Sequence, residues 1–519
     1  MNAKQEEFLK KREKLLEMGG MDKIAKQHAK GKLTARERLD LLFDKGTFVE
    51  IGMFVKQRKT DFGLDKKYIP GDGVVAGYGK VNGRTVYAYS QDFTALGGSI
   101  GEMTGEKMQR VMRAAIRTGC PLVALNDGAG GRIQEGNDIP HLTFVFNQSV
   151  KASGYIPQVA AVMGPCAGGC AYSPALMDYI VSVDKTSTMF LTGPKVIKQV
   201  TGEVCDENFG SGRFHAEISG VSHDLASDDY ECIEKIKQYL SYFPQNCQEM
   251  PPVYACDQDP DELIPELNDI IPESTSKSYD VYKIIKLIAD HDSVFEYYGK
   301  WAKNLVTCLA RLNGRPVGFI ANNTKVRAGV MDIDSSDKMS RFVTLCDAYN
   351  IPLVFLADVP GFLPGIGQEK GGVIRHGAKT LYANSAATVP KIRLTMRKFY
   401  GGGTAAMCDW GHEPDTTISW PGAEDAVMGA AGACEIIHAA ALKKAREEGG
   451  EEGYRAKLKE LSDDYELQFN NPYRRAEIFS TEMIIMPEET RKVLIKVLDS
   501  FYTKKVDNWP PKKHGIFPV

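Results

Sequence analysis

Residues 121–127, Pro-Leu-Val-Ala-Leu-Asn-Asp, return 231 residues later as Pro-Leu-Val-Phe-Leu-Ala-Asp at 352–358. Each copy is a short apolar run that ends in an aspartate, which is the pattern of a buried parallel strand. A Lys-Met-x-Arg stretch beginning at Lys107 leads into the first copy, and one beginning at Lys338 leads into the second, at the same offset (338 − 107 = 231). A stretch of helical period joins each pair, and strands alternating with helices predict an α/β fold.

The repeat extends on both sides of these strands. Residues 82–84, Asn-Gly-Arg, recur at 313–315, and the run 157–163 with its following glycines, Gly168 and Gly169, recurs as 390–396 with Gly401 and Gly402. This order and spacing predict an internal duplication with two homologous domains, residues 1–265 and 266–519. A proline-rich linker is expected at 244–272, a helical N-terminal extension at 1–50 and a charged surface helix at 442–466.

Composition narrows the class of protein. The chain has 519 residues, a net charge of −3, and hydrophobic residues make up 43%. These values are typical of a soluble globular protein and give no indication of a nucleic-acid partner. The N-terminus is charged from Lys4 onward, which is unlike a secretory signal, and the 11 cysteines form no paired framework, so a reducing cytoplasm is expected. Cys166 and Cys170 are close together, but no second pair completes a zinc site, so no metal is predicted.

Two glycine pairs follow equivalent strands and are the candidate site. Gly168-Gly169 comes after the apolar run 159–163, and a glycine triplet at 401–403 comes after 392–396. Glycine allows a sharp turn and close approach of a ligand to the backbone N–H groups. If a helix follows each turn, its first amides favour an anion or a developing oxyanion. Two such turns indicate two carbonyl-type oxygens stabilised in one reaction.

Other motifs were weighed against this interpretation. Gly97-Gly98-Ser99-Ile100-Gly101 matches G-x-S-x-G, but no strand directly precedes the serine and no Asp–His pair is evident. Gly128-Ala129-Gly130-Gly131 resembles a dinucleotide fingerprint, but its third glycine would fall on Ile133. No phosphate-binding GxxxxGK[ST] loop occurs, which disfavours ATP chemistry. His376 is the histidine most open to a functional role, although a structural role is expected.

These segments resemble a known family, the biotin-dependent acyl-CoA carboxyltransferases. This family includes propionyl-CoA carboxylase β subunits, the transcarboxylase acyl-CoA subunit and methylmalonyl-CoA decarboxylase α subunits. The stretches that carry the resemblance cover almost the whole chain and are residues 26–48, SQDFTALGGSIGE at 90–102, RIQEG at 132–136, GPCAGGCAYSPAL at 164–176, IRHGA at 374–378 and KKHGIFPV at 512–519.

The resemblance implies a crotonase-like spiral fold in each half and an active site formed by the N-domain of one subunit and the C-domain of another, usually in a hexamer. It also implies transfer of a carboxyl group between biotin and the α-carbon of a short acyl-CoA, without a side-chain base. Gly168 and Gly169 would stabilise the thioester oxygen, and Gly402 and Gly403 the ureido oxygen of biotin. The substrate-binding residues implied are Gly97, Gly98, Gly128, Ala129, Gly130, Gly131, Arg132 and Ala405.

The chain departs from the family pattern at two places. The usual DSGGARIQEG reads Asp127-Gly-Ala-Gly-Gly-Arg132, and the usual YGGAY reads Tyr400-Gly-Gly-Gly-Thr404. The loss of bulk at Thr404 and Ala405 leaves the identity of the acyl group open. No A-M-K-M biotinylation site occurs, so biotin is expected on a separate carrier protein.

Partners would set the direction of the reaction. A biotin carboxylase subunit would make the complex a carboxylase, and sodium-pumping membrane subunits would make it a decarboxylase. A biotin-independent crotonase-like enzyme and a non-catalytic acyl-CoA-binding scaffold are the remaining alternatives.

Overall fold

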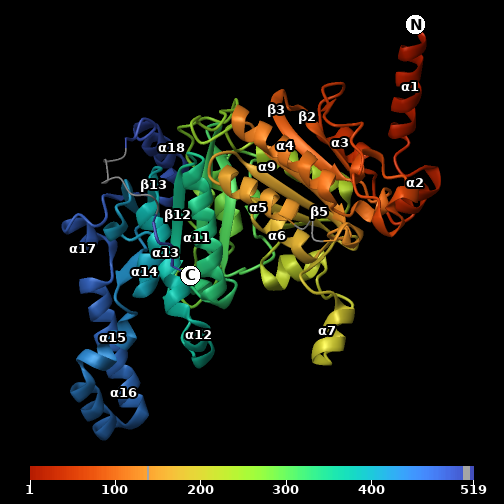
Figure 1. The fold of residues 1–519 in the computed structure, drawn as a ribbon. Helices are drawn as coiled ribbons and strands as arrows, with labels where there is room; N and C mark the ends of the chain where they lie inside the picture. The colour runs from red at the N-terminus through yellow and green to blue at the C-terminus, as the bar shows by residue number, and fades with distance from the viewer. Residues whose placement is uncertain (137–139, 506–514, 519) are drawn as a thin grey trace. The chain divides into compact units, whose positions relative to one another are not determined.

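The computed structural model describes residues 1–136, 140–505 and 515–518. The chain forms two compact units, Met1–Met250 and Pro251–Val519. This division falls inside the predicted linker, and Ile264 and Leu267 already belong to the apolar core of the second unit. Figure 1 shows the two units by colour, the first from red to yellow and the second from green to blue.

The described part of unit 1 contains one mixed sheet of eight strands in the order β1-β2-β3-β4-β5-β6-β8, with β7 paired to β5. The pairs β1–β2 and β2–β3 are antiparallel, and the strands from β3 onward are parallel. The strands are β1 (Val49–Glu50), β2 (Val74–Val81), β3 (Arg84–Gln91), β4 (Leu122–Gly128), β5 (Gln158–Ala167), β6 (Tyr179–Val183), β7 (Thr188–Phe190) and β8 (Asp224–Ala226).

Helices cover this sheet because each buries an apolar face against the apolar side chains of the strands. Helix α4 packs on β2 and β3 and buries Met108, Val111 and Met112, while α9 packs on β6. The helices of unit 1 are α1 (Ala3–Leu16), α2 (Met21–His28), α3 (Ala35–Leu42), α4 (Glu102–Thr118), α5 (Pro140–Ala152), α6 (Tyr172–Ala175), α7 (Pro194–Thr201), α8 (Gly212–Phe214) and α9 (Asp229–Leu240). The predicted helical extension corresponds to α1–α3, and α1 stands away from the sheet of its unit (Figure 1).

Unit 2 repeats this topology. Its described strands form a sheet in the order β16-β14-β13-β12-β11-β10-β9, with β15 paired to β13. The central parallel pairs have the same register in both units: Leu122 lies opposite Gln158, and Leu353 lies opposite Lys391. The strands are β9 (Phe295–Tyr297), β10 (Leu305–Leu312), β11 (Arg315–Asn322), β12 (Leu353–Val359), β13 (Lys391–Tyr400), β14 (Thr416–Ser419), β15 (Glu424–Ala426) and β16 (Met483–Ile484).

The helices of unit 2 also follow the repeat. Helix α11 corresponds to α4. The segment 442–466, predicted as one charged helix, falls in α16, which extends away from the sheet of its unit (Figure 1) and is broken at Gly450, where φ is 62°, so it consists of two helices. The helices are α10 (Val281–Ile288), α11 (Ile333–Ala348), α12 (Ile366–Gly371), α13 (Val373–Ala386), α14 (Gly402–Ala406), α15 (Ala430–Ile437), α16 (Ala439–Phe469), α17 (Pro472–Glu477) and α18 (Thr490–Ser500).

Candidate functional site

The first candidate turn lies at the carboxyl end of β5. The strand ends at Ala167, and Gly168 then takes a left-handed conformation with φ of 64°. A residue with a side chain is disfavoured at such a φ, so glycine allows the chain to reverse here. A single 3₁₀ turn, Gly168–Ala171, follows at once and leads into α6.

The second candidate turn has the same construction at the end of β13. The strand ends at Tyr400, Gly401 has φ of 53°, and α14 begins at Gly402. By backbone conformation Gly401 is therefore the equivalent of Gly168, and Gly402 is the equivalent of Gly169. The family pattern places the second oxyanion hole at Gly402 and Gly403, one residue further along the chain than this equivalence.

In the described part of the chain, the candidate amides of both turns lack a protein acceptor, and Gly403 is the one of these glycines that is buried. Among the described residues, the N–H groups of Gly168 and Gly169 have no hydrogen-bond acceptor, and neither do those of Gly402 and Gly403. The N–H of Gly401 differs, because it donates to the Ala426 carbonyl at 3.2 Å. Unsatisfied donors at the first turn of a helix attract a negative oxygen. Two adjacent amides in each unit therefore have the chemistry of an oxyanion hole.

The space around the glycines differs between positions. A Cβ added to Gly169 would lie 3.5 Å from Leu142, and one added to Gly402 would lie 3.4 Å from the Phe362 ring, both ordinary contacts. A Cβ at Gly403 would lie only 2.6 Å from Val359 Cγ2. The family pattern has alanine at this position, and an alanine at 403 would require the end of β12 or the turn to shift.

The two predicted substrate loops of unit 1 are hydrogen-bonded to one another. Ala129 N–H donates to the Gly97 carbonyl at 2.9 Å, and Ile100 N–H donates to the Gly130 carbonyl at 2.9 Å. Gly98 packs so closely on the Asp127 carbonyl that an added Cβ would lie 2.3 Å from it. A Cβ added to Gly130 would lie 3.1 Å from the Ala167 carbonyl oxygen, next to the first turn. The loops thus reach the unpaired amides of Gly168 and Gly169. Gly128 is the last residue of β4 and Gly131 follows Gly130 in the chain, so both lie close to Gly130.

Arg132 has a different role from the one predicted. Its guanidinium is fully buried, pairs with Asp72 and Glu135 at 2.6 Å each, and donates to the Ser99 carbonyl at 3.0 Å. The same two carboxylates accept N–H groups of the first turn of α4, at Thr104 and Glu102. Arg132 therefore holds two acids that cap α4, and its side chain is not available to bind a substrate. The loop around it remains a candidate for binding.

A buried ion network that no sequence motif indicates holds the end of β4 in place. The Arg38 guanidinium bonds both Asp127 and Asp229 at 2.8 Å, and Lys32 bonds Asp127 at 2.6 Å. Burial opposes the charged form, but the two carboxylates outweigh it and raise the pKa of Arg38. Burial lowers the pKa of Lys32 despite the neighbouring Asp127. The N-terminal extension is thus bound to the strand that leads into the substrate loop.

Four other residues that the sequence singles out are Ala405, His376, Cys166 and Cys170, and each contacts or is buried within the protein. Ala405 lies in α14, and its carbonyl accepts from Asn384 at 3.4 Å. His376 Nδ1 lies 2.9 Å from both Asp337 oxygens, a contact within the protein that indicates a structural role. Cys166 and Cys170 are buried free thiols, and burial raises the pKa of Cys170 to about 12. Within the described residues no group of three His, Cys, Asp or Glu side chains is placed to hold a metal ion.

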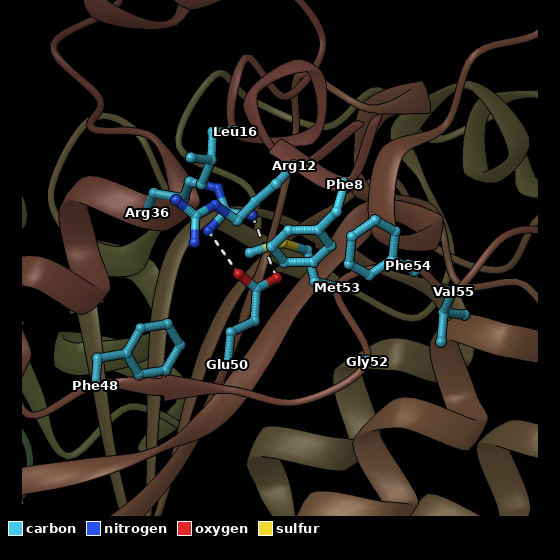
Figure 2. A pocket seen from close by; sticks show the side chains of 10 residues that line it. All are labelled: Phe8, Arg12, Leu16, Arg36, Phe48, Glu50, Gly52, Met53, Phe54 and Val55. Carbon is cyan, nitrogen blue, oxygen red and sulfur yellow. Dashed lines mark hydrogen bonds and ion pairs between the residues drawn. The ribbon is translucent and has the colours of Figure 1, made fainter. Parts of the chain in front are cut away.

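A surface pocket of 820 Å³ in unit 1 contains none of the predicted site residues. Figure 2 shows its aromatic lining, with Phe8 beside Phe54, and the Glu50 carboxylate below them. That carboxylate is held by two hydrogen bonds from Arg36, at 2.8 and 3.2 Å. The pocket therefore offers no unpaired acid for chemistry. No helix in the described ranges is both long and apolar enough to cross a bilayer.

Comparison with known proteins gives a consistent result. Residues 26–517 match the family described as "Carboxyl transferase domain". The chain is 46% identical to the methylmalonyl-CoA decarboxylase subunit alpha of Propionigenium modestum, over 99% of this chain and 98% of that one. It is 44% identical to the human mitochondrial propionyl-CoA carboxylase beta chain, over 98% and 92% respectively.

Solved structures confirm the predicted fold. A crystal structure of transcarboxylase 12S, described as a hexamer assembly with methylmalonyl-coenzyme A and methylmalonic acid bound, superposes with a TM-score of 0.95 at 44% identity, covering 100% of this chain and 99% of that one. A single-chain long-chain acyl-CoA carboxylase superposes with a TM-score of 0.81 at 27% identity, covering 96% of this chain and 50% of that one. The expectation of an α/β protein with two homologous crotonase-like domains is therefore correct.

Proposed function

Because the chain belongs to the carboxyl transferase family, which confirms the predicted class of enzyme, we propose that it moves a carboxyl group between carrier-bound biotin and the α-carbon of a short acyl-CoA. The acyl group is proposed to be of the propionyl or methylmalonyl type. One observation carries the proposal: each unit presents two adjacent backbone amides without an acceptor among the described residues, at equivalent strand ends. The names of the relatives support the choice of substrate.

The amides of unit 1 are assigned to the thioester. When the α-carbon gives up or receives the carboxyl group, negative charge develops on the thioester oxygen. The N–H groups of Gly168 and Gly169 can donate to that oxygen, and each fixed donor of this kind is worth about 2.7–4 kcal/mol in a measured hydrolase. The loop Gly128–Gly131 and the residues Gly97 and Gly98 bound to it are proposed to hold the acyl-CoA.

The amides of unit 2 are assigned to the ureido oxygen of biotin. A urea oxygen accepts two hydrogen bonds, so the paired donors at Gly402 and Gly403 fit it. Biotin, when bound, would supply the nitrogen that carries the carboxyl group. The chain's own contribution is to place that oxygen and to stabilise negative charge on it. Ala405 lies in the same short helix, α14, and is proposed to contact the substrate there.

The partner subunits are proposed to determine whether the complex carboxylates or decarboxylates its substrate. We propose a hexamer, with a biotin carboxyl carrier protein as the source of biotin and with a cytoplasmic location. A biotin carboxylase subunit would complete a carboxylase. The two decarboxylase α subunits at 46% identity favour a second arrangement, with membrane decarboxylase subunits and loss of CO2.

The test is carboxyl transfer from methylmalonyl-CoA to free biotin by the purified chain. Formation of propionyl-CoA that depends on added biotin is the expected result. Hydration of an enoyl-CoA without biotin would support a crotonase-like enzyme instead. Tight binding of the CoA ester with no transfer would support a non-catalytic scaffold, and either result would contradict the proposal.

A further inference from the structure

The loops that follow β4 and β12 differ at one position near the two turns: Gly131 in unit 1 corresponds to Phe362 in unit 2. Each residue makes an isolated parallel bridge shortly after a central strand, Gly131 with Ile100 after β4 and Phe362 with Met331 after β12. Both bridge residues are related by the 231-residue offset of the duplication (362 − 131 = 231). The backbone therefore holds the two residues at the same place, and the side chain is what differs.

The Phe362 ring lies directly beside the second turn. Its Cδ2 is 3.4 Å from the position of a Cβ on Gly402, and its Cζ is 3.2 Å from that of a Cβ on Gly377 of α13. Glycine at 377 lets the ring pack this closely on the helix, and the ring itself remains partly exposed. A ligand oxygen that accepts from Gly402 N–H must approach to about 2.9 Å. The remainder of that ligand then comes within contact distance of an aromatic wall.

The residues that the structure describes place no such ring at the equivalent position of unit 1. Gly131 is exposed, and nothing among the described residues lies within 4 Å of a Cβ placed on it. Leu142 of α5 is the residue that contacts Gly169, and it is buried. Among the described residues, no ring therefore occupies the position in unit 1 that the Phe362 ring occupies beside Gly402 in unit 2. A long flexible chain suits the open position in unit 1, and a compact planar ring suits the position beside Phe362 in unit 2.

We propose that Phe362 is a specificity-determining residue of unit 2, which selects a flat cyclic urea over a thioester with its long pantetheine chain. The bare backbone at Gly131 correspondingly leaves the first turn open to the acyl-CoA. This inference rests on the proposed function, which assigns the two turns to their two substrates, and it adds a side chain that distinguishes them. Aromatic faces favour planar ring systems by contact area and by ring geometry.

Two reciprocal variants test it. Phe362→Ala removes the wall from unit 2, and Gly131→Phe adds one to unit 1, where the space is open. Transfer from methylmalonyl-CoA to free biotin gives the KM of each substrate. Saturation-transfer NMR of free biotin gives a readout without turnover, because ring protons near Phe362 receive more saturation than the valerate chain. Phe362→Leu serves as the conservative variant, and thermal midpoints check folding.

Phe362→Ala is expected to raise the KM for biotin roughly tenfold, to remove the ring-proton preference and to leave the KM for methylmalonyl-CoA within twofold. Phe362→Leu is expected to fall between, and Gly131→Phe to raise the KM for methylmalonyl-CoA alone. An unchanged biotin KM in Phe362→Ala, or an equal rise for both substrates, would overturn the inference. A wild-type chain without biotin-dependent transfer would instead overturn the proposed function, and this inference with it.

Discussion

Replacing Gly169 by valine should separate catalysis from folding. Gly169 does not have a left-handed φ, so a residue with a side chain can adopt its backbone conformation, and its added Cβ meets only Leu142 at an ordinary 3.5 Å. The free energy of unfolding should therefore change by less than about 1 kcal/mol, since the helical cost of valine is offset by a less flexible unfolded chain. The branched side chain, however, stands beside an amide that must contact the substrate oxygen.

Loss of one oxyanion donor costs about 2.7–4 kcal/mol, which is roughly 10²–10³ in rate. The assay is kcat/KM for transfer from methylmalonyl-CoA to free biotin, with urea denaturation of the same preparation. Gly169→Ala is the matched control, because it adds the same Cβ without the branches, and it should keep the wild-type stability and most of the activity. A Gly169→Val variant with kcat/KM within threefold of wild type would refute the role given to this turn.

Three further changes address the packing and charge around the turns. Gly403→Ala should destabilise the protein by about 1–3 kcal/mol in urea denaturation, because its Cβ would lie 2.6 Å from Val359, and Val359→Ala in the same chain should recover part of that loss. Arg38→Met should cost about 3–5 kcal/mol, since it leaves the buried Asp229 without a cation and Asp127 with Lys32 alone, and an unchanged urea midpoint would contradict the network. Burial lowers the pKa of His215 below that of the unfolded chain, so the unfolded state binds more protons near pH 6.5 and stability should fall as the pH drops below about 6.5. His215→Gln should lose less stability than wild type between pH 7.5 and 5.5.

The duplication was predictable because local sequence carries it. Strand length, the terminal aspartate and the glycine turn are properties of short segments, so two copies at a constant offset could be recognised without coordinates. The helical extension and the helical character of 442–466 followed from composition for the same reason, but the break at Gly450 did not. The family resemblance then indicated the crotonase-like fold, which the superposition with transcarboxylase 12S confirms.

The contacts that support the site could not be predicted in this way. Arg132 lies 60 residues from Asp72, and Arg38 lies 89 residues from Asp127, so no local pattern pairs them. The Arg-x-x-Glu spacing of Arg132 and Glu135 is a local signal for a buried ion pair, but the family resemblance assigns this segment to a substrate-binding loop. The asymmetry at Phe362 was hidden as well, because the bridge that places it opposite Gly131 is a tertiary feature.

The most direct test is a structure of the assembled protein with a methylmalonyl-CoA analogue and biotin bound together. The account predicts that the thioester oxygen accepts hydrogen bonds from the amides at Gly168 and Gly169, and that the ureido oxygen accepts from those at Gly402 and Gly403. A thioester oxygen held by a side chain or a metal ion, with the four glycine amides facing water, would contradict it.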